Sequence, residues 1–125
     1  MPSQTIFIVD DHPVNLELVK VVLTLEGYEV HTATDAESAL SALSELTPDL
    51  ILMDVQLPGM DGLELARRLK SDPHLRNSRI VALTAYAMKG DQEKALAAGC
   101  QGYLSKPIDT RTFPKVVAHY LQQTP

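Results

Sequence analysis

Short apolar runs alternate with helical patterns along the whole chain, and this alternation limits the possible folds more than any other feature. The first run, residues 5–9, is Thr-Ile-Phe-Ile-Val and ends at two aspartates. Similar runs occupy residues 28–32, 50–53, 80–83 and 102–104. Runs of this length, rich in β-branched and other apolar residues, are typical of buried strands. We therefore expect five strands.

A helical pattern follows each of these runs. Apolar residues recur at helical spacing over residues 14–26, 36–46, 63 to about 70, 91–98 and 113–121. Pro13 suits the first turn of a helix, Gly27 and Gly99 suit helix ends, and Pro48 breaks the second helix. The segment 57–62 is rich in turn residues and predicts a loop.

Five strand-then-helix units in 125 residues predict an α/β fold with an open parallel sheet. Right-handed crossovers place helices on both faces of such a sheet. Five units are too few for an eight-unit barrel, and no linker or repeat interrupts them. We expect one domain over residues 1–125.

Composition excludes several classes of protein. Eleven Lys and Arg stand against sixteen Asp and Glu, a formal net charge of −5, which disfavours direct binding to nucleic acid or to an anionic membrane surface. The single cysteine, Cys100, allows no disulfide within the chain. Neither a signal peptide nor an apolar run of membrane-spanning length is visible, so the predicted location is the cytoplasm.

Polar residues follow four of the five predicted strands. In open parallel sheets, ligands bind at the carboxyl ends of the strands, near the switch in strand order. At these ends stand Asp10 and Asp11, Asp54, Thr84 and Lys106. We therefore predict that these five side chains share one site.

The residue types at this site point to phosphoryl transfer. Three carboxylates in one pocket repel one another, so they either take up protons or share a cation. Mg²⁺ prefers oxygen ligands, and the lack of a His and Cys cluster argues against zinc. A carboxylate can attack phosphorus when a metal and a nearby cation neutralise the transferring oxygens. Lys106 supplies that cation and Thr84 a hydroxyl donor; Mg²⁺ avoids imidazole, which places His12 at the rim of the pocket.

At this point the sequence resembles the receiver domains of two-component response regulators, and the resemblance covers essentially the whole chain. Thr84 comes 30 residues after Asp54, and Lys106 another 22 residues later, which agrees with the family pattern. Five motifs in order carry the resemblance: Val9-Asp10-Asp11-His12, Leu52-Met53-Asp54, residues 57–62, Ala82-Leu83-Thr84-Ala85 and Tyr103-Leu104-Ser105-Lys106-Pro107.

The resemblance implies a flavodoxin-like (βα)5 sandwich with strand order 2-1-3-4-5. It also implies that Asp54 is the phosphoacceptor and a ligand of Mg²⁺. Asp11 would bind the metal directly, Asp10 mainly through water, and the backbone carbonyl of Gln56 would complete the protein's ligands.

The resemblance implies roles for the remaining site residues as well. Thr84 and Lys106 would contact the phosphoryl oxygens, and the Lys106-Pro107 peptide bond would be cis. Phosphorylation would draw Thr84 inward and let the ring of Tyr103 turn into the space, although a half-buried aromatic that only packs is the alternative. Phosphorylation biases conformations that already exist.

The implied phosphoryl donor is a histidine kinase or a histidine phosphotransfer domain. The implied readout face, toward a downstream protein or domain, is the fourth helix, fifth strand and fifth helix. The domain would be a signalling phosphoacceptor that catalyses only its own phosphorylation and autodephosphorylation. Residues 13–15, 53–56 and 84–91 resemble receivers of hybrid histidine kinases or phosphorelays. We expect either a stand-alone regulator or part of a longer protein, with no output domain in these 125 residues.

Three other functions share parts of this pattern. A magnesium-dependent phosphohydrolase with an Asp nucleophile usually has a second Asp two residues later, where this chain has Gln56. A flavin-binding electron carrier needs a phosphate loop rich in Ser, Thr and Gly where this chain has Asp10-Asp11-His12-Pro13. A degenerate receiver that serves only as a binding module is disfavoured by the intact pocket.

Overall fold

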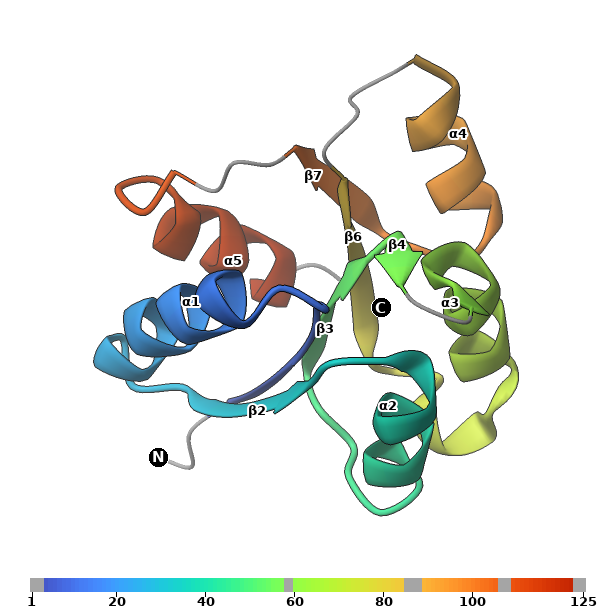
Figure 1. Ribbon diagram of the computed structural model, residues 1–125, viewed down its shortest axis with the longest axis horizontal. Helices are drawn as coiled ribbons and strands as arrows, with labels where there is room; N and C mark the ends of the chain where they lie inside the picture. The colour runs from blue at the N-terminus through green and yellow to red at the C-terminus, as the bar shows by residue number, and fades with distance from the viewer. Residues whose placement is uncertain (1–3, 58–59, 85–88, 106–108, 123–125) are drawn as a thin grey trace.

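The computed structural model describes residues 4–57, 60–84, 89–105 and 109–122, and its strands and helices alternate along the chain (Figure 1). The elements are β1 (Thr5–Val9), α1 (Pro13–Leu25), β2 (Glu29–Ala33), α2 (Ala36–Leu43), β3 (Leu50–Asp54), β4 (Gln56–Leu57), β5 (Met60–Asp61), α3 (Gly62–Ser71), the 3-10 helix η1 (Pro73–Leu75), β6 (Arg79–Thr84), α4 (Lys89–Ala97), β7 (Gly102–Ser105) and α5 (Phe113–Gln122).

The main sheet has five parallel strands in the order β2-β1-β3-β6-β7. β6 and β7 are the fourth and fifth strands predicted above, so the predicted order 2-1-3-4-5 is confirmed. β3 is central, and all five of its residues are buried. A strand covered on both faces needs a continuous apolar run, which explains the sequence Leu-Ile-Leu-Met before Asp54.

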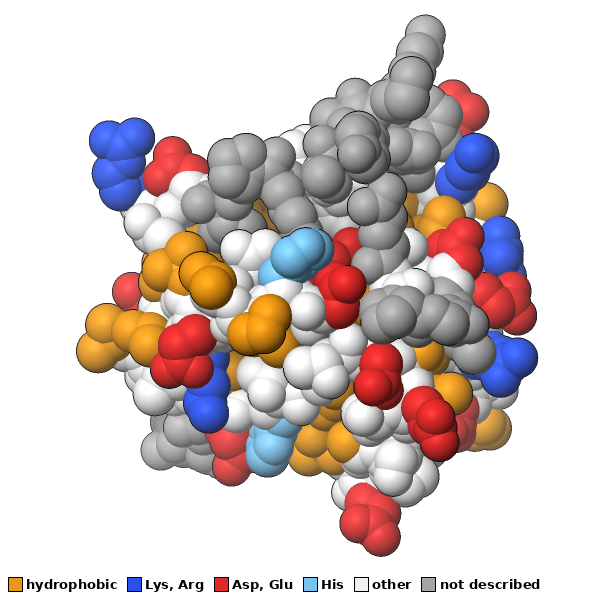
Figure 2. Space-filling model, in the orientation of Figure 1, with side chains coloured by type: hydrophobic (Ala, Val, Ile, Leu, Met, Phe, Trp, Pro, Cys, Tyr) orange, Lys and Arg blue, Asp and Glu red, His pale blue; other side chains and the backbone are white. Residues whose placement is uncertain are grey.

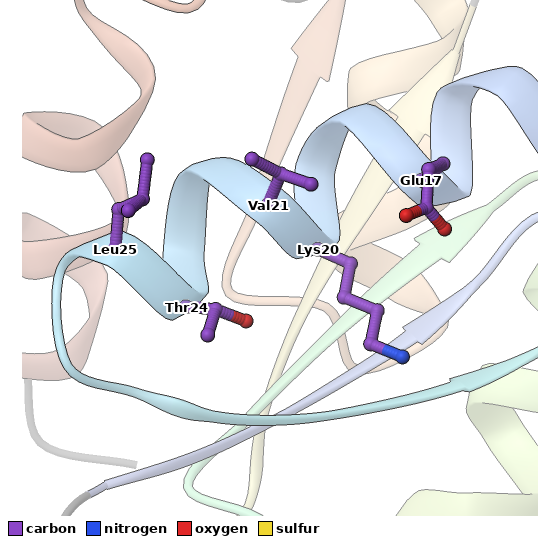
Figure 3. Close-up of a pocket in the computed structure, with 5 residues that line it drawn as sticks. All are labelled: Glu17, Lys20, Val21, Thr24 and Leu25. Carbon is purple, nitrogen blue, oxygen red and sulfur yellow. The ribbon is translucent and has the colours of Figure 1, made fainter.

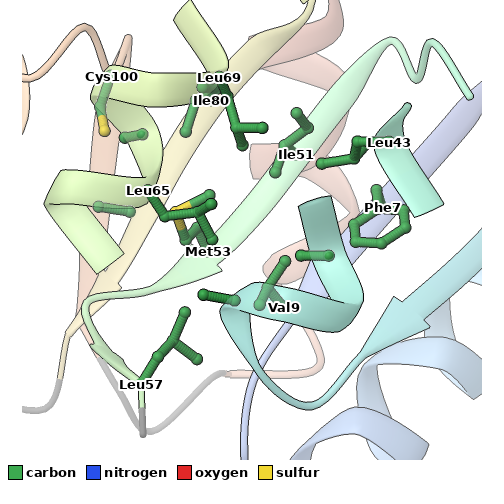
Figure 4. Packing of buried hydrophobic residues seen from close by; sticks show 14 of the residues in the cluster. Phe7, Val9, Leu43, Ile51, Met53, Leu57, Leu65, Leu69, Ile80 and Cys100 are labelled. Atoms are coloured by element: carbon green, nitrogen blue, oxygen red, sulfur yellow. The ribbon is translucent and has the colours of Figure 1, made fainter. Parts of the chain in front are cut away.

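Helices cover both faces of the sheet: α1 and α5 lie on one side, and α2, α3 and α4 on the other (Figure 1). Side chains of successive strand residues point to opposite faces, so the sheet separates two hydrophobic cores. Ile51 and Met53 belong to the core beneath α2, α3 and α4, which we call the α2–α4 core (Figure 4). Leu50 and Leu52 belong to the core beneath α1 and α5, the α1–α5 core.

The second helix is shorter than predicted. The apolar stripe suggests a helix as far as Leu46, but α2 ends at Leu43. Beyond the helix, Leu46 still packs against the α2–α4 core. The ring nitrogen Nε2 of His74 lies 3.1 Å from the carbonyl oxygen of Leu43 and 3.2 Å from that of Leu46. A distant side chain therefore provides hydrogen bonding for carbonyls that a longer helix would have satisfied itself.

The segment predicted as a loop forms a small antiparallel ribbon as well. Gln56 pairs with Asp61 and Leu57 with Met60 in β4 and β5. Two-residue strands show no periodicity, so the sequence pattern does not reveal them. Within the described part of the chain, no helix combines the length and apolar character needed to cross a membrane.

Candidate functional site

The carboxyl edge of the sheet brings three aspartates together. Val9 of β1 is paired in register with Met53 of β3, so the residues that follow them, Asp10 and Asp54, leave neighbouring strands side by side. Both side chains are buried, each residue with 2% of its surface exposed. Asp11 is exposed, and one carboxylate oxygen from each aspartate lies within 4.8 Å of the others. The predicted convergence of Asp10, Asp11 and Asp54 is thus present.

His12 joins this cluster more closely than its sequence interpretation suggests. Its Nδ1 lies 3.1 Å from Oδ1 of Asp10, 3.1 Å from Oδ1 of Asp11 and 4.0 Å from Oδ2 of Asp54. Its backbone N–H donates a 2.9 Å hydrogen bond to Oδ1 of Asp10. The side chain is 63% exposed, so the ring stands at the rim while contacting the carboxylates. Figure 2 shows a histidine beside acidic side chains on this face.

The backbone around Asp54 is held from two sides. The N–H of Val55 donates to the carbonyl of Leu83 in β6, and the N–H of Gly62 donates to the carbonyl of Val55, both at 3.0 Å. A Cβ atom at Gly62 would collide with the carbonyl oxygen of Asp54 and lie 2.7 Å from Cα of Val55. Only glycine fits there without a shift of the Asp54 backbone. Sequence reasoning missed this role, since Gly62 looked like an ordinary turn residue.

Thr84 lies on the next strand, at the same edge. Its preceding residue, Leu83, is paired in register with Asp54, and Thr84 itself is buried, with 2% exposed. Thr84 is paired with Ser105, and Tyr103 of β7 is half-buried against the α2–α4 core.

Predictions for Lys106 and for the Lys106-Pro107 bond concern positions outside the described residues. Gln56 lies in β4, two residues after Asp54.

The donor set suits Mg²⁺. Oxygen atoms of three carboxylates converge, two from buried residues and one from a residue open to solvent. Mg²⁺ binds such hard oxygen ligands and keeps several waters, for which an exposed side is required. The single imidazole at the rim, His12, is not part of a nitrogen and sulfur set of the kind that zinc selects.

Comparison with known proteins agrees with this site. The model of the response regulator receiver domain matches residues 6–118. The polar-differentiation response regulator DivK of Brucella anthropi is 41% identical over 121 residues, which cover 97% of this chain and 98% of the relative.

Two solved structures are similar in sequence and in fold. The receiver domain of a sensor histidine kinase from Pseudomonas aeruginosa, with a magnesium ion coordinated in its active-site cleft, is 33% identical with a TM-score of 0.87, covering 98% of this chain and 100% of that one. A response regulator from Burkholderia pseudomallei with a phosphorylated aspartic acid, a calcium ion and citrate is 26% identical with a TM-score of 0.85, covering 97% of this chain and 68% of that one.

Fold, acid cluster and relatives together define the class: this chain belongs to the response regulator receiver domain family. Its function is that of a phosphoacceptor domain in two-component signalling. Members of this family act with histidine kinases or phosphotransfer proteins and with downstream effectors. Neither the phosphohydrolase nor the binding-only alternative gains support from the comparisons.

Proposed function

We propose that this chain, as a single receiver domain over residues 1–125, accepts a phosphoryl group on Asp54 from the phosphohistidine of a histidine kinase or histidine phosphotransfer domain. The observation that carries the proposal is the burial of Asp54 at the carboxyl edge of the sheet, with the carboxylates of Asp10 and Asp11 beside it. A carboxylate oxygen of Asp54 bonds to phosphorus while the phosphorus–nitrogen bond of the donor breaks.

Asp10, Asp11, Asp54 and the backbone carbonyl of Gln56 would hold Mg²⁺. The bound ion supplies positive charge that neutralises the oxygens of the transferring phosphoryl group. Thr84 donates its hydroxyl hydrogen bond to one of these oxygens from the end of β6. Lys106, which directly follows Ser105 in the sequence, supplies the second positive charge. Asp54 is thereby both metal ligand and nucleophile.

The same proposal assigns the response. Thr84 moves toward the phosphoryl group, Tyr103 turns inward, and the face formed by α4, β7 and α5 changes its affinity for a downstream protein or domain. The domain catalyses only its own phosphorylation and autodephosphorylation. It makes no direct contact with nucleic acid or membrane, and it works in the cytoplasm, where an unpaired thiol such as Cys100 stays reduced.

Incubation with acetyl phosphate, with and without Mg²⁺, followed by intact mass measurement, tests the assignment. We expect one phosphate adduct on the wild-type chain, dependent on Mg²⁺, and none on Asp54→Asn. The control variant Asp109→Asn removes an exposed aspartate outside the cluster and should keep the adduct. Turnover of many substrate equivalents would instead support the phosphohydrolase. A wild-type chain that accepts phosphate from no small donor or kinase and does not bind beryllofluoride would be a binding module.

A further inference from the structure

His12 places a nitrogen ligand beside the acid cluster of Asp10, Asp11 and Asp54. Its ring nitrogen and one carboxylate oxygen from each aspartate all lie within 4.8 Å of one another. In the part of the chain that the structure describes, this is the one group of three or more carboxylate, imidazole or thiol side chains close enough to share an ion. The function proposed above uses the three carboxylates but gives the imidazole no task.

The separations between these atoms match the ligands of an octahedral ion. Nδ1 of His12 lies 3.1 Å from Oδ1 of Asp10, 3.1 Å from Oδ1 of Asp11 and 4.0 Å from Oδ2 of Asp54. Ligands about 2.1 Å from an octahedral ion are about 3.0 Å apart when adjacent and about 4.2 Å apart when opposite. Ligands of a tetrahedral ion at that distance are about 3.4 Å apart, which the 4.0 Å separation exceeds. The spacing therefore favours an octahedral ion over tetrahedral zinc.

We propose that Nδ1 of His12 is a metal ligand and makes the acid cluster select divalent transition ions of the Fe²⁺, Co²⁺ and Ni²⁺ class over Mg²⁺. Such ions accept imidazole nitrogen together with carboxylate oxygen, whereas Mg²⁺ prefers oxygen alone. With its proton on Nε2, the imidazole offers the lone pair of Nδ1 to the space that the carboxylates share. Asp11 and His12 are exposed, so water can complete the six ligands. The inference rests on the metal site of the proposed function, because His12 determines which ion fills that site.

The hollow along α1 lacks these properties. Glu17, Lys20, Val21, Thr24 and Leu25 line it (Figure 3). Only one of these side chains is a carboxylate, and the ammonium group of Lys20 repels cations. The acid cluster instead offers three carboxylates and an imidazole, so we assign the transition ion to the cluster.

Isothermal titration calorimetry of the untagged chain with Mg²⁺, Mn²⁺, Co²⁺ and Ni²⁺ tests the selectivity. Wild-type affinity should rise from Mn²⁺ through Co²⁺ to Ni²⁺. His12→Phe keeps a ring but removes both nitrogens, so it should raise the Kd for Co²⁺ and Ni²⁺ about tenfold or more and leave the Kd for Mg²⁺ unchanged. His31→Phe is the matched control, because His31 contacts the single carboxylate of Glu29 outside the cluster. It should leave every Kd unchanged.

Cobalt also reports the ligand directly. The unpaired electrons of Co²⁺ shift the proton resonances of a coordinated imidazole far outside their ordinary range. These contact shifts pass through the coordinate bond, so a ring that only lies nearby does not show them. The proton NMR spectrum of the Co²⁺-loaded wild type should contain such resonances. They should be absent from His12→Phe and present in His31→Phe.

Two results would overturn this proposal and leave the proposed function intact. Equal effects of His12→Phe on the Kd of Mg²⁺ and of Co²⁺ would mean that the imidazole only positions the carboxylates or competes with any cation. A Co²⁺ spectrum without shifted imidazole resonances would place Nδ1 outside the ligands. In both cases Mg²⁺-dependent phosphorylation of Asp54 by acetyl phosphate would continue. If Asp11→Ala instead bound every ion as wild type does, the ion would bind elsewhere, and the metal site of the proposed function would fail as well.

Discussion

The geometry around Asp54 depends on a residue that carries no side chain. Gly62 begins α3, and its N–H binds the carbonyl of Val55 directly behind the phosphoacceptor position. The close approach comes from the tertiary packing of α3 against the end of β3. Sequence reasoning can find Asp54, because an apolar run ends in a carboxylate there, but not the steric role of Gly62.

Gly62→Ala should lower both stability and phosphorylation. Its added methyl group meets the backbone of Asp54 and Val55, which cannot move aside as a flexible side chain can. We expect a loss of about 1–3 kcal/mol in the free energy of unfolding, measured by urea denaturation, and slower labelling by acetyl phosphate. Gly27→Ala is the matched control. Gly27 has a φ of +95°, which alanine adopts only with strain, but a Cβ atom added there would have no neighbouring atom within 4 Å. It should lose stability yet keep the wild-type labelling rate; equal labelling of the two variants would refute the steric role.

Cys100 is predicted to be an unreactive thiol in the folded chain. Burial raises the pKa of this thiol to about 11, although the nearby charge of Lys70 opposes the change. At neutral pH the thiolate fraction is then about a hundredfold lower than for a free cysteine. Iodoacetamide should therefore modify the native chain at least that much more slowly than the urea-unfolded chain. Similar rates in the two states would show that the thiol is accessible.

At the scale of elements, local pattern predicts where strands and helices lie better than where they end. β3 is visible because burial on both faces demands an apolar run. The end of α2 is not visible in the local pattern, because it depends on a distant side chain. The ring of His74, 31 residues after Leu43, lies within hydrogen-bond distance of the carbonyl of Leu43. The β4–β5 ribbon escapes prediction for a different reason: each of its strands has only two residues, too few to show any period.

The start of α2 depends on a charge-dependent cap. A side-chain oxygen of Asp35 accepts a 2.7 Å hydrogen bond from the N–H of Ser38, and this bond lowers the pKa of Asp35 below its usual value. A carboxyl whose pKa is lower in the folded state adds stability above its unfolded pKa and loses it as the pH falls through the folded value. Asp35→Ala should thus reduce the urea midpoint at pH 7, and the difference should shrink below about pH 4.

Asp35→Asn is the matched variant for this cap. Asparagine offers a neutral oxygen to the same N–H, so this variant should stay close to wild type at pH 7. Because asparagine does not ionise, the urea midpoint of Asp35→Asn should not contain the stability that wild type loses as Asp35 becomes protonated. A difference between wild type and Asp35→Ala that stays constant from pH 7 to pH 3 would contradict the charged cap.

For the whole molecule, the parallel sheet explains why so much of the site is predictable. Once five strands run parallel, their carboxyl ends must share an edge, and the polar residues after them must meet there. Asp10, Asp54 and Thr84 follow from that rule, and the register of β1, β3 and β6 agrees with it. Contacts such as those of His12 with Asp10 and Asp11 depend on side-chain orientation, which no pattern of strands contains.

Mg²⁺ should stabilise the whole domain. An ion that binds the folded carboxylate cluster but not the unfolded chain adds about 1.4 kcal/mol to the free energy of unfolding at ten times its Kd. We expect the thermal midpoint to rise with added Mg²⁺ and to return on chelation by EDTA. Asp11→Ala should lose this rise, whereas Asp109→Ala, outside the cluster, should keep it. A rise of equal size in both variants would argue for binding elsewhere.

The sheet also separates the proposed phosphoacceptor from the proposed switch residue. Leu52 points into the α1–α5 core, and Asp54, two residues later, continues that side of β3. Ala82 points into the α2–α4 core, as Tyr103 does, and Thr84 continues that side of β6. A phosphoryl group on Asp54 is therefore added on the opposite side of the sheet from the aromatic ring. In the proposed function Thr84, at the strand end where the two sides meet, would relay phosphorylation of Asp54 to Tyr103. Loss of the Thr84 hydroxyl should therefore still allow phosphorylation of Asp54 but abolish the response of Tyr103.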